Sequence, residues 1–148
     1  MHVRQGTIAD LDSLVPLFDA YRAFYGQRSD MDLARSFLLE RLRSLQSVIF
    51  VAFSEQDEAI GFAQLFPSFS SVRAARTFIL NDLFVAQEAR GRGAGNALLA
   101  AAADFGRAAG AARLTLSTAH DNLAAQKLYE RADWSRETAF LSYNLALD

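Results

Sequence analysis

The sequence predicts an α/β (α+β) fold in which helices flank a mixed, mostly antiparallel central sheet, in the order β-α-α-β-β-β-α-β-α-β-β. Two observations predict it. Apolar residues alternate with period two in some segments and recur every three or four positions in others, which separates strands from helices. One helical segment lies between the strand that ends at Val85 and the strand that follows Ala112, so these strands should be parallel neighbours. Strands joined by short turns should be antiparallel.

Length and composition are those of an ordinary globular chain. Its 148 residues, 51% of them apolar, predict one domain spanning 1–148. The net charge of −2 gives no reason to expect nucleic acid or a membrane surface as a partner. With no cysteine and two histidines, the sequence predicts no disulfide and no metal site. It contains no apolar run of membrane-spanning length and no signal-peptide core, so we expect a cytoplasmic protein.

The first half of the chain is expected to hold two helices among its strands. A short strand at 2–6 leads to Thr7, whose hydroxyl, with Asp10 three residues later, is typical of a helix N-terminus. Apolar residues at helical spacing extend this helix to about Phe24, although Pro16 is awkward inside it. The elements expected next are a helix opened by Ser29 and Asp30 and carried to Leu45, a strand at 47–53, a strand at 59–66 and a loop at 67–71.

The second half alternates strands and helices. We expect a long strand at 75–85, a helix at 95–109, a short strand at 113–117, a helix capped by Asp121 and Asn122 that ends at Arg131, and two final strands at 134–137 and 140–147. No internal repeat, linker or low-complexity segment interrupts this order.

A glycine-rich turn joins the long strand to the helix at 95–109. The run Arg90-Gly91-Arg92-Gly93-Ala94-Gly95-Asn96 removes side chains at alternate positions and places guanidinium groups beside bare backbone. The alanines and leucines that follow favour a helix, so free backbone N–H groups should gather at its N-terminus. Orphan donors and the helix dipole both favour anions, and this turn is therefore predicted to bind a diphosphate.

Two common nucleotide motifs do not fit this turn. A P-loop would end in Gly-Lys-Ser/Thr, whereas here Gly95 is followed by Asn96, and a G-x-G-x-x-G fingerprint would need glycine at Asn96 or Leu98. The pattern Arg-x-x-Gly-x-Gly, made by Arg90, Gly93 and Gly95, does fit. It resembles the acyl-CoA pyrophosphate loop of the GCN5-related N-acetyltransferases, the GNAT superfamily. The alternative is a tight turn whose arginines serve solubility.

A second motif lies in the last predicted helix. Asn122, Ala125, Leu128 and Tyr129 match the GNAT signature N-x-x-A-x-x-L-Y-x-x-x-G-F/W, with Asp133 where the family usually has glycine. That glycine forms a left-handed helix cap, which Asp also tolerates, so the departure is mild. The GNAT fold has the element order predicted above, and the resemblance covers nearly the whole chain.

The resemblance implies acetyl-CoA as cosubstrate. The backbone at 83–85 should pair with the pantetheine arm like an added strand, and the loop at 90–96 should hold the pyrophosphate. In the family, the tyrosine at the Tyr129 position points toward the sulfur, where a phenol can protonate the leaving thiolate. The alternatives are that Tyr129 packs on the sheet and that Asn122 only caps its helix. The cofactor-binding residues so implied are Leu83, Phe84, Val85, Arg90, Gly91, Arg92, Gly93, Ala94, Gly95, Asn96 and Asn122.

The residues just before the pantetheine segment concern the catalytic base. Many polyamine acetyltransferases of the superfamily read Glu-Asp there, whereas this chain reads Asn81-Asp82. Asn81 cannot take a proton, so the resemblance leaves Asp82 to accept the amine proton through water or to bind the ammonium group. The alternative is a strand-end carboxylate paired with Arg76 or Arg113.

The acceptor groove of the GNAT fold is lined by the first two helices and the loop between the third and fourth strands. The aromatic residues Tyr21, Tyr25 and Phe69 fall there and are the predicted substrate residues. Tyr21 and Tyr25 are one helical turn apart, and with Asp82 they could hold a cationic amine. Equally, they could be core residues.

Together these expectations describe an N-acetyltransferase that moves an acetyl group from acetyl-CoA to a small-molecule primary amine, such as a small amine, a polyamine or an amino acid. Attack is direct, with Tyr129 and Asp82 as the catalytic residues. One alternative is a non-catalytic acyl-CoA-binding sensor, supported only by Asn81 in place of Glu. Another is an acetyltransferase of protein lysines or N-termini. Dimerisation is common in the superfamily, and the final strands could mediate a homodimer.

Overall fold

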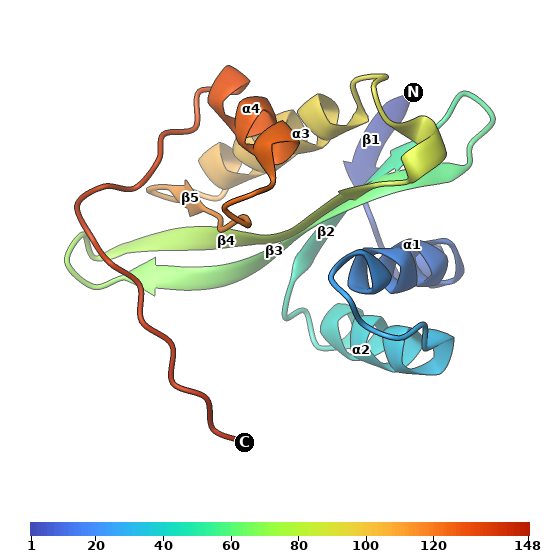
Figure 1. Ribbon diagram of the computed structural model, residues 1–148, viewed down its shortest axis with the longest axis horizontal. Coiled ribbons are helices and arrows are strands. Elements are labelled where there is room, and N and C mark those ends of the chain that lie inside the picture. Colours follow the sequence, from blue (N-terminus) through green and yellow to red (C-terminus); the bar gives the residue numbers. More distant parts are fainter. The chain divides into compact units, whose positions relative to one another are not determined.

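The computed structural model describes all residues 1–148, which form two compact units, Met1–Ser117 and Thr118–Asp148 (Figure 1). The first unit holds the sheet, and the single-domain expectation stays a prediction. Its elements are β1 (His2–Gln5), α1 (Leu11–Phe24), α2 (Met31–Arg43), β2 (Val48–Phe53), β3 (Ala59–Ser70), β4 (Ala75–Val85), α3 (Ala94–Ala108) and β5 (Leu114–Thr115). Short 3-10 helices at Ile8–Asp10 and Gln87–Ala89 precede α1 and α3. The second unit contains α4 (Leu123–Arg131).

Five strands form one sheet in the order β1-β2-β3-β4-β5. Neighbours pair antiparallel except β4 and β5, which are parallel and are joined by α3 as the crossover. The predicted fold class, a mixed and mostly antiparallel sheet with flanking helices, is therefore confirmed. None of the helices combines the length and the apolar composition that crossing a lipid bilayer requires.

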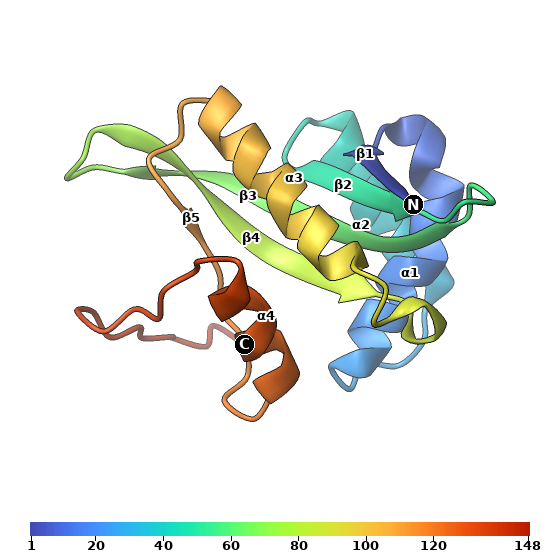
Figure 2. The ribbon, with the colours of Figure 1, turned by 90° about the horizontal axis from the view of Figure 1, so that it is seen from above.

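Helices cover both faces of the sheet. Figure 2 shows α3 crossing β2, β3 and β4 on one face, where the Phe105 ring packs against Phe50 and Phe78 at centroid distances of 5.8 and 5.2 Å. Helices α1 and α2 lie on the other face, where Phe18 stacks on Phe37 at 5.4 Å and contacts the fully buried Phe62 of β3. The main apolar core lies between the sheet and helices α1 and α2.

The predicted capping chemistry is present, but it begins the 3-10 helix Ile8–Asp10 that leads into α1, and α1 itself has no side-chain cap. The Thr7 hydroxyl accepts from the Ala9 N–H at 3.2 Å, and the Asp10 carboxylate accepts from the Thr7 N–H at 2.8 Å. Arg4 on β1 closes the arrangement with two hydrogen bonds to Asp10 at 2.8 and 2.9 Å. Pro16 lies within the helix without ending it. These contacts hold the short 3-10 helix that connects β1 to α1.

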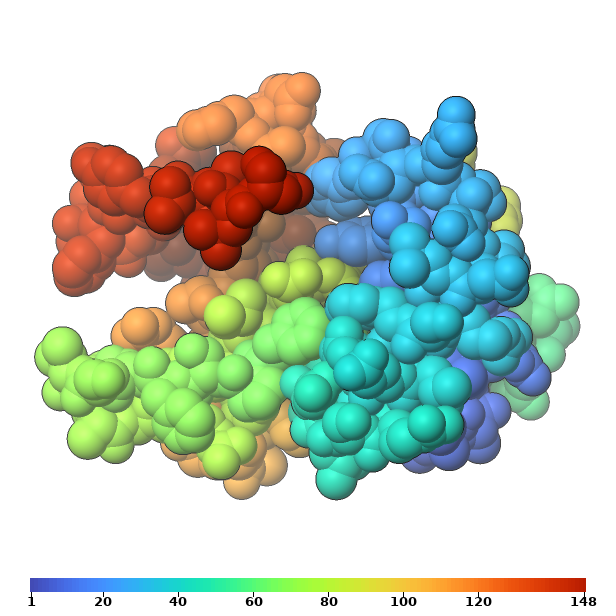
Figure 3. Space-filling view, turned by 90° about the horizontal axis from the view of Figure 1, so that it is seen from below, coloured from blue at the N-terminus to red at the C-terminus, as the bar shows by residue number.

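Strand β3 is longer than predicted, and the loop expected at 67–71 is wrong. Pro67 is opposite Phe78, and the pairing continues to Ser70 opposite Ala75. Proline is tolerated because β2 pairs with β3 only as far as Leu65, so this part of β3 has one free edge. The tip of the hairpin projects away from α1 and α2 (Figure 3).

Two further expectations are corrected. Helix α2 ends at Arg43, and Leu45 is exposed with φ of +52 instead of extending the apolar face. The strands expected at 134–137 and 140–147 are not formed. Alternating apolar residues indicate that a segment can form a strand with one buried face. A strand also needs a partner strand to hydrogen-bond with, and residues 134–147 pair with none. Its large apolar side chains are exposed: Phe140, Leu141, Tyr143, Leu145 and Leu147.

The second unit confirms the predicted cap of the last helix. Asp133, where the family has glycine, has φ of +67. The Asp133 N–H donates to the Glu130 carbonyl at 3.2 Å, and the Trp134 N–H donates to the Tyr129 carbonyl at 3.0 Å. This is the Schellman arrangement, which places a left-handed residue just after the helix.

Candidate active site

The glycine loop has the geometry of an anion site. Gly91 and Gly93 have φ of +78° and +89°, which residues with a Cβ rarely adopt. The six backbone N–H groups from Gly91 to Asn96 donate no hydrogen bond within the protein, and the first helical bond runs from the Ala97 N–H to the Gly93 carbonyl at 3.0 Å. A row of unbonded donors thus stands at the N-terminus of a 15-residue helix.

The two loop arginines differ in their contacts. The Arg90 Nε donates to the Val85 carbonyl at 3.0 Å, and its guanidinium lies over the rings of Phe24 and Phe84 at 5.7 and 5.5 Å. Arg90 therefore ties the end of β4 to α1. Arg92 is exposed and forms no hydrogen bond or ion pair within the protein, which leaves its charge available to an anion.

Strand β4 leaves one edge open. Leu83, Phe84 and Val85 are opposite residues 61–63 of β3 on one side. On the other side β5 pairs only with Phe78 and Ile79, so no strand pairs with β4 beyond them. The backbone to which the resemblance assigns pantetheine is thus an unpaired edge, the arrangement that accepts an added extended chain. The contact itself stays a prediction.

An extra residue in β4 directs Asp82 toward α1. Gln64 is opposite Asp82 but Leu65 is opposite Leu80, so Asn81 is the bulged residue between them. In a regular strand Leu80 and Asp82, two residues apart, would point to the same face. With the bulge, Leu80 stays with Leu65 on the α3 face, and Asp82 joins Gln64 on the face of α1 and α2.

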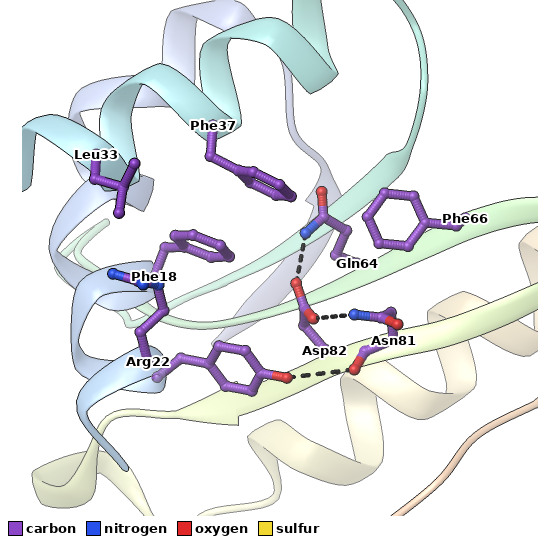
Figure 4. A pocket seen from close by; sticks show the side chains of 9 residues that line it. Phe18, Arg22, Leu33, Phe37, Gln64, Phe66, Asn81 and Asp82 are labelled. Atoms are coloured by element: carbon purple, nitrogen blue, oxygen red, sulfur yellow. Dashed lines mark hydrogen bonds between the residues drawn. The ribbon is translucent and has the colours of Figure 1, made fainter. Parts of the chain in front are cut away.

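Asp82 is held by amide donors instead of by an arginine. Its side chain is only 3% exposed, and the Gln64 amide donates to Oδ2 while the Asn81 amide donates to Oδ1 at 2.8 Å (Figure 4). The Ser47 hydroxyl donates in turn to the Gln64 Oε1 at 2.7 Å. The alternative ion pair with Arg76 or Arg113 is not formed. The chain Ser47–Gln64–Asp82–Asn81 fixes the orientation of the carboxyl group.

Burial raises the pKa of the Asp82 carboxyl above its ordinary value, and the hydrogen bonds from Gln64, Asn81 and Tyr21 act against that rise. Removal from water disfavours the charged form, whereas donors aimed at the oxygens favour it. A carboxylate with a raised pKa is a better proton acceptor than an ordinary surface aspartate.

A pocket of about 380 Å³ opens beside Asp82, within the size range of small-molecule sites. Its walls are mostly aromatic, and in Figure 4 Gln64 and Asp82 stand on its sheet side with Phe18 and Phe37 on its helix side. The lining residues are Phe18, Tyr21, Arg22, Leu33, Phe37, Gln64, Phe66, Asn81 and Asp82.

Of the three predicted substrate residues, one lines this pocket. The Tyr21 hydroxyl donates to the Asn81 carbonyl at 3.3 Å, which places its ring beside Asp82. Tyr25 packs edge-on against Tyr21 at 5.2 Å but does not line the pocket. Phe69, 70% exposed, lies on the far part of β3 with Arg76 over its ring. Substrate contact by these residues stays a prediction.

The predicted acid lies in the second unit. Tyr129 is on α4, half-buried, with its ring 6.2 Å from that of Trp134. Asn122 caps the same helix, its side-chain oxygen accepting from the Ala125 N–H at 3.2 Å. The cap is confirmed, and the catalytic role of Tyr129 and a cofactor contact by Asn122 stay predictions.

Sequence reasoning missed Gln64 and Arg22. Gln64 is the one polar residue in an otherwise apolar strand segment, Ala59 to Phe66. A polar side chain in a buried strand could have identified it as a candidate site residue. Arg22 gives no comparable signal, because an arginine on the polar side of an amphipathic helix is ordinary.

The chain's similarity to known proteins agrees with this geometry. The sequence profile described as "Acetyltransferase (GNAT) family" matches residues 12–134. The Bacillus subtilis (strain 168) protein "Uncharacterized N-acetyltransferase YhfO" is 48% identical over 145 residues, which cover 98% of this chain and 97% of that protein. A "Probable acetyltransferase" of Haemophilus influenzae is 40% identical over 96 residues, 65% of this chain and 66% of the relative.

Solved structures give the same result. A crystal structure of a probable acetyltransferase matches with a TM-score of 0.96 at 42% identity, covering 100% of this chain and 99% of the other. An aminoglycoside N-acetyltransferase in complex with CoA shares the fold, with a TM-score of 0.80 at 21% identity over 97% of this chain and 93% of its own. The chain therefore belongs to the GNAT family and is an acetyltransferase.

Proposed function

We propose that this acetyltransferase transfers the acetyl group of acetyl-CoA to a primary amine bound in the pocket beside Asp82. One observation carries the proposal. The unpaired edge of β4 leads from the pocket at Asp82 to the loop whose six N–H groups are unbonded. Asp82 and Val85 are three residues apart, roughly 10 Å along a strand, so one extended molecule can follow the edge between loop and pocket.

The loop and edge suit the phosphates and the amide-rich arm of acetyl-CoA. Unbonded donors at a helix N-terminus and the uncommitted charge of Arg92 favour a diphosphate. Free backbone groups on the edge of β4 can pair with amides in an extended arm. Acetyl-CoA supplies an activated carbonyl, and the protein supplies alignment and a route for protons.

Asp82 has the position and chemistry to receive a proton from the amine. A protonated amine entering the pocket meets the carboxylate, which can hold the ammonium group and accept its proton directly or through water. The amine nitrogen then forms the C–N bond as the C–S bond breaks, and the bonding pair leaves with sulfur. Tyr129 is the proposed donor of the proton that converts the thiolate to a thiol. Orientation of the two substrates supplies most of the rate enhancement.

The test is release of free thiol from acetyl-CoA with a panel of primary amines, beside a calorimetric measurement of CoA binding. We expect thiol release with at least one class of amine, a reduction of about 100-fold or more in Asp82→Asn, and at least tenfold lower kcat in Tyr129→Phe. Full turnover by Tyr129→Phe at saturating substrate would remove that role.

The alternatives separate in the same experiment. CoA binding without thiol release from any small amine or lysine peptide would favour the sensor, and release with peptides alone would favour protein acetylation. If CoA does not bind, the assignment of the loop at 90–96 is wrong.

A further inference from the structure

Arg22 is a charged group in the pocket that the proposed reaction does not use. It lies on α1, is partly buried and lines the pocket together with Asp82. Acetyl transfer needs a proton acceptor near the amine, but it needs no guanidinium on the acceptor side. The other α1 and α2 residues of the pocket wall, Phe18, Tyr21, Leu33 and Phe37, are apolar or aromatic. A cation in such a wall therefore needs its own explanation.

The Arg22 guanidinium donates no hydrogen bond within the protein. Arg22 makes no hydrogen bond and no ion pair, although its charge contributes to lowering the pKa of nearby Asp19. Asp19 forms no hydrogen bond with the Arg22 guanidinium. Its carboxylate accepts instead from the Ser29 hydroxyl and from the Asp30 N–H, both at 2.7 Å. The donors of Arg22 thus remain available, and a planar guanidinium is well suited to a carboxylate.

The two charges of the pocket stand apart. In Figure 4 the Arg22 guanidinium lies beside Phe18 on the helix side, whereas the Asp82 carboxyl group lies on the sheet side with Gln64 and Asn81. The rings of Phe18, Phe37 and Phe66 also line the pocket. The pocket therefore offers an anion for an ammonium group, a cation for an anion and an apolar surface for the body of the ligand.

Building on the proposed function, we propose that the acceptor is an amino acid: a primary amine with an apolar body and a free carboxylate, whose ammonium group binds Asp82 and whose carboxylate binds Arg22. The arrangement discriminates against polyamines and aminoglycosides, since a second ammonium group would face the guanidinium instead of an anion. It also disfavours protein lysines and N-termini, which lack a carboxylate close to the amine.

The test compares acceptors that differ only in charge. One set is phenylalanine, phenylalanine amide and phenethylamine. A second set is 6-aminohexanoate, hexylamine and 1,6-diaminohexane, which places the second charge at the far end of the chain. We expect one carboxylate-bearing member to exceed its uncharged and cationic partners in kcat/KM by about tenfold or more, an effect typical of a charge-assisted bidentate contact. The set in which this preference appears indicates the distance between the ammonium group and the carboxylate that the pocket accepts.

Variants assign the effect to one residue. Arg22→Gln should raise KM for the preferred carboxylate acceptor about tenfold, leave kcat nearly unchanged and leave the uncharged acceptors within twofold of the wild type. Arg22→Lys should recover part of the preference. Arg28→Gln, which removes the same charge from an exposed residue outside the pocket, is the matched control and should change nothing.

Calorimetric binding of the same acceptors to the protein without acetyl-CoA separates this inference from the proposed function. Preferential carboxylate binding that is lost in Arg22→Gln supports the inference even if no acetyl group is transferred. Transfer to amines without a carboxylate preference, or an equal loss for all acceptors in Arg22→Gln, overturns it. Absence of preferential binding in the wild type overturns it as well.

Discussion

Asp82 illustrates how a single side chain acquires its properties from its neighbours. Sequence resemblance identified the residue, but its partners could not be predicted, because an ion pair with Arg76 or Arg113 was equally compatible with the sequence. The structure gives it amide donors instead. Amide donors stabilise the carboxylate without adding a positive charge that would repel an ammonium group. Asp82 therefore remains attractive to a cation, which an Arg–Asp pair would not be.

Replacing Gln64 should change the pH dependence of the enzyme. Gln64→Leu removes a donor to the carboxylate, so the pKa of Asp82 should rise further and the acid limb of the kcat/KM profile should move to higher pH. A hydrogen bond to a charged group is worth about 1.5–3 kcal/mol, which corresponds to roughly one to two pH units. The measurement is kcat/KM against pH with one fixed amine.

Ser47→Ala serves as the control, because it removes the Ser47–Gln64 bond and keeps the Gln64–Asp82 bond. Ser47→Ala should move the acid limb of the kcat/KM profile far less than Gln64→Leu does. An unmoved limb in Gln64→Leu, or equal shifts in both variants, would show that Gln64 does not control the ionisation of Asp82.

At the scale of elements, the glycine loop depends on backbone geometry. Gly93→Ala should weaken CoA binding about tenfold, because a Cβ at φ of +89° costs on the order of 1 kcal/mol and moves the loop away from its anion-binding conformation. Isothermal calorimetry with CoA measures this directly.

Gly110 provides the matched comparison at the other end of α3. It has φ of +74° with no atom near its absent side chain, so Gly110→Ala should cost similar stability and leave CoA affinity unchanged. Equal CoA affinity in Gly93→Ala and the wild type would contradict the assignment of the loop.

Elements governed by local chemistry were predictable, and elements governed by pairing were not. The Thr7–Asp10 cap, the left-handed Asp133 and the start of α3 depend on a few adjacent residues, and each is present in the structure. The extension of β3 through Pro67 depends on a partner strand that sequence patterns do not reveal. The prediction of C-terminal strands was wrong for the same reason. The alternation at 140–147 indicates which side chains would share one face of a strand, but it does not identify a partner strand. The bulge at Asn81 likewise has no local sequence signature.

At the scale of the whole molecule, two buried carboxyl groups should make the free energy of unfolding depend on pH in opposite directions. The Arg4 hydrogen bond holds the pKa of Asp10 below its ordinary value, so its contribution is present above about pH 4 and is lost as pH falls through the lowered pKa. The stability contributed by Asp82 depends on pH in the opposite direction. Its pKa is raised, so its contribution is present below about pH 4 and is lost as pH rises through the raised value.

Urea unfolding of Asp82→Asn and the wild type between pH 3 and 8 should show this directly. The difference in unfolding free energy should be flat in acid, shift in favour of the variant as pH rises through the pKa of Asp82, and then level off. Asp10→Asn should show a difference of opposite slope at the acid end. A pH-independent difference for Asp82→Asn would mean that Asp82 has the same pKa in the folded and unfolded chain.

Under the proposed function, the open edge of β4 would make the stability of the protein depend on the supply of a metabolite. If acetyl-CoA completes that edge, its binding favours the folded chain by mass action, by about 2.7 kcal/mol at a concentration 100 times the dissociation constant. The same molecule would then protect an edge that could otherwise pair with another chain. Where acetyl-CoA is scarce, the protein would lose this protection together with its proposed substrate.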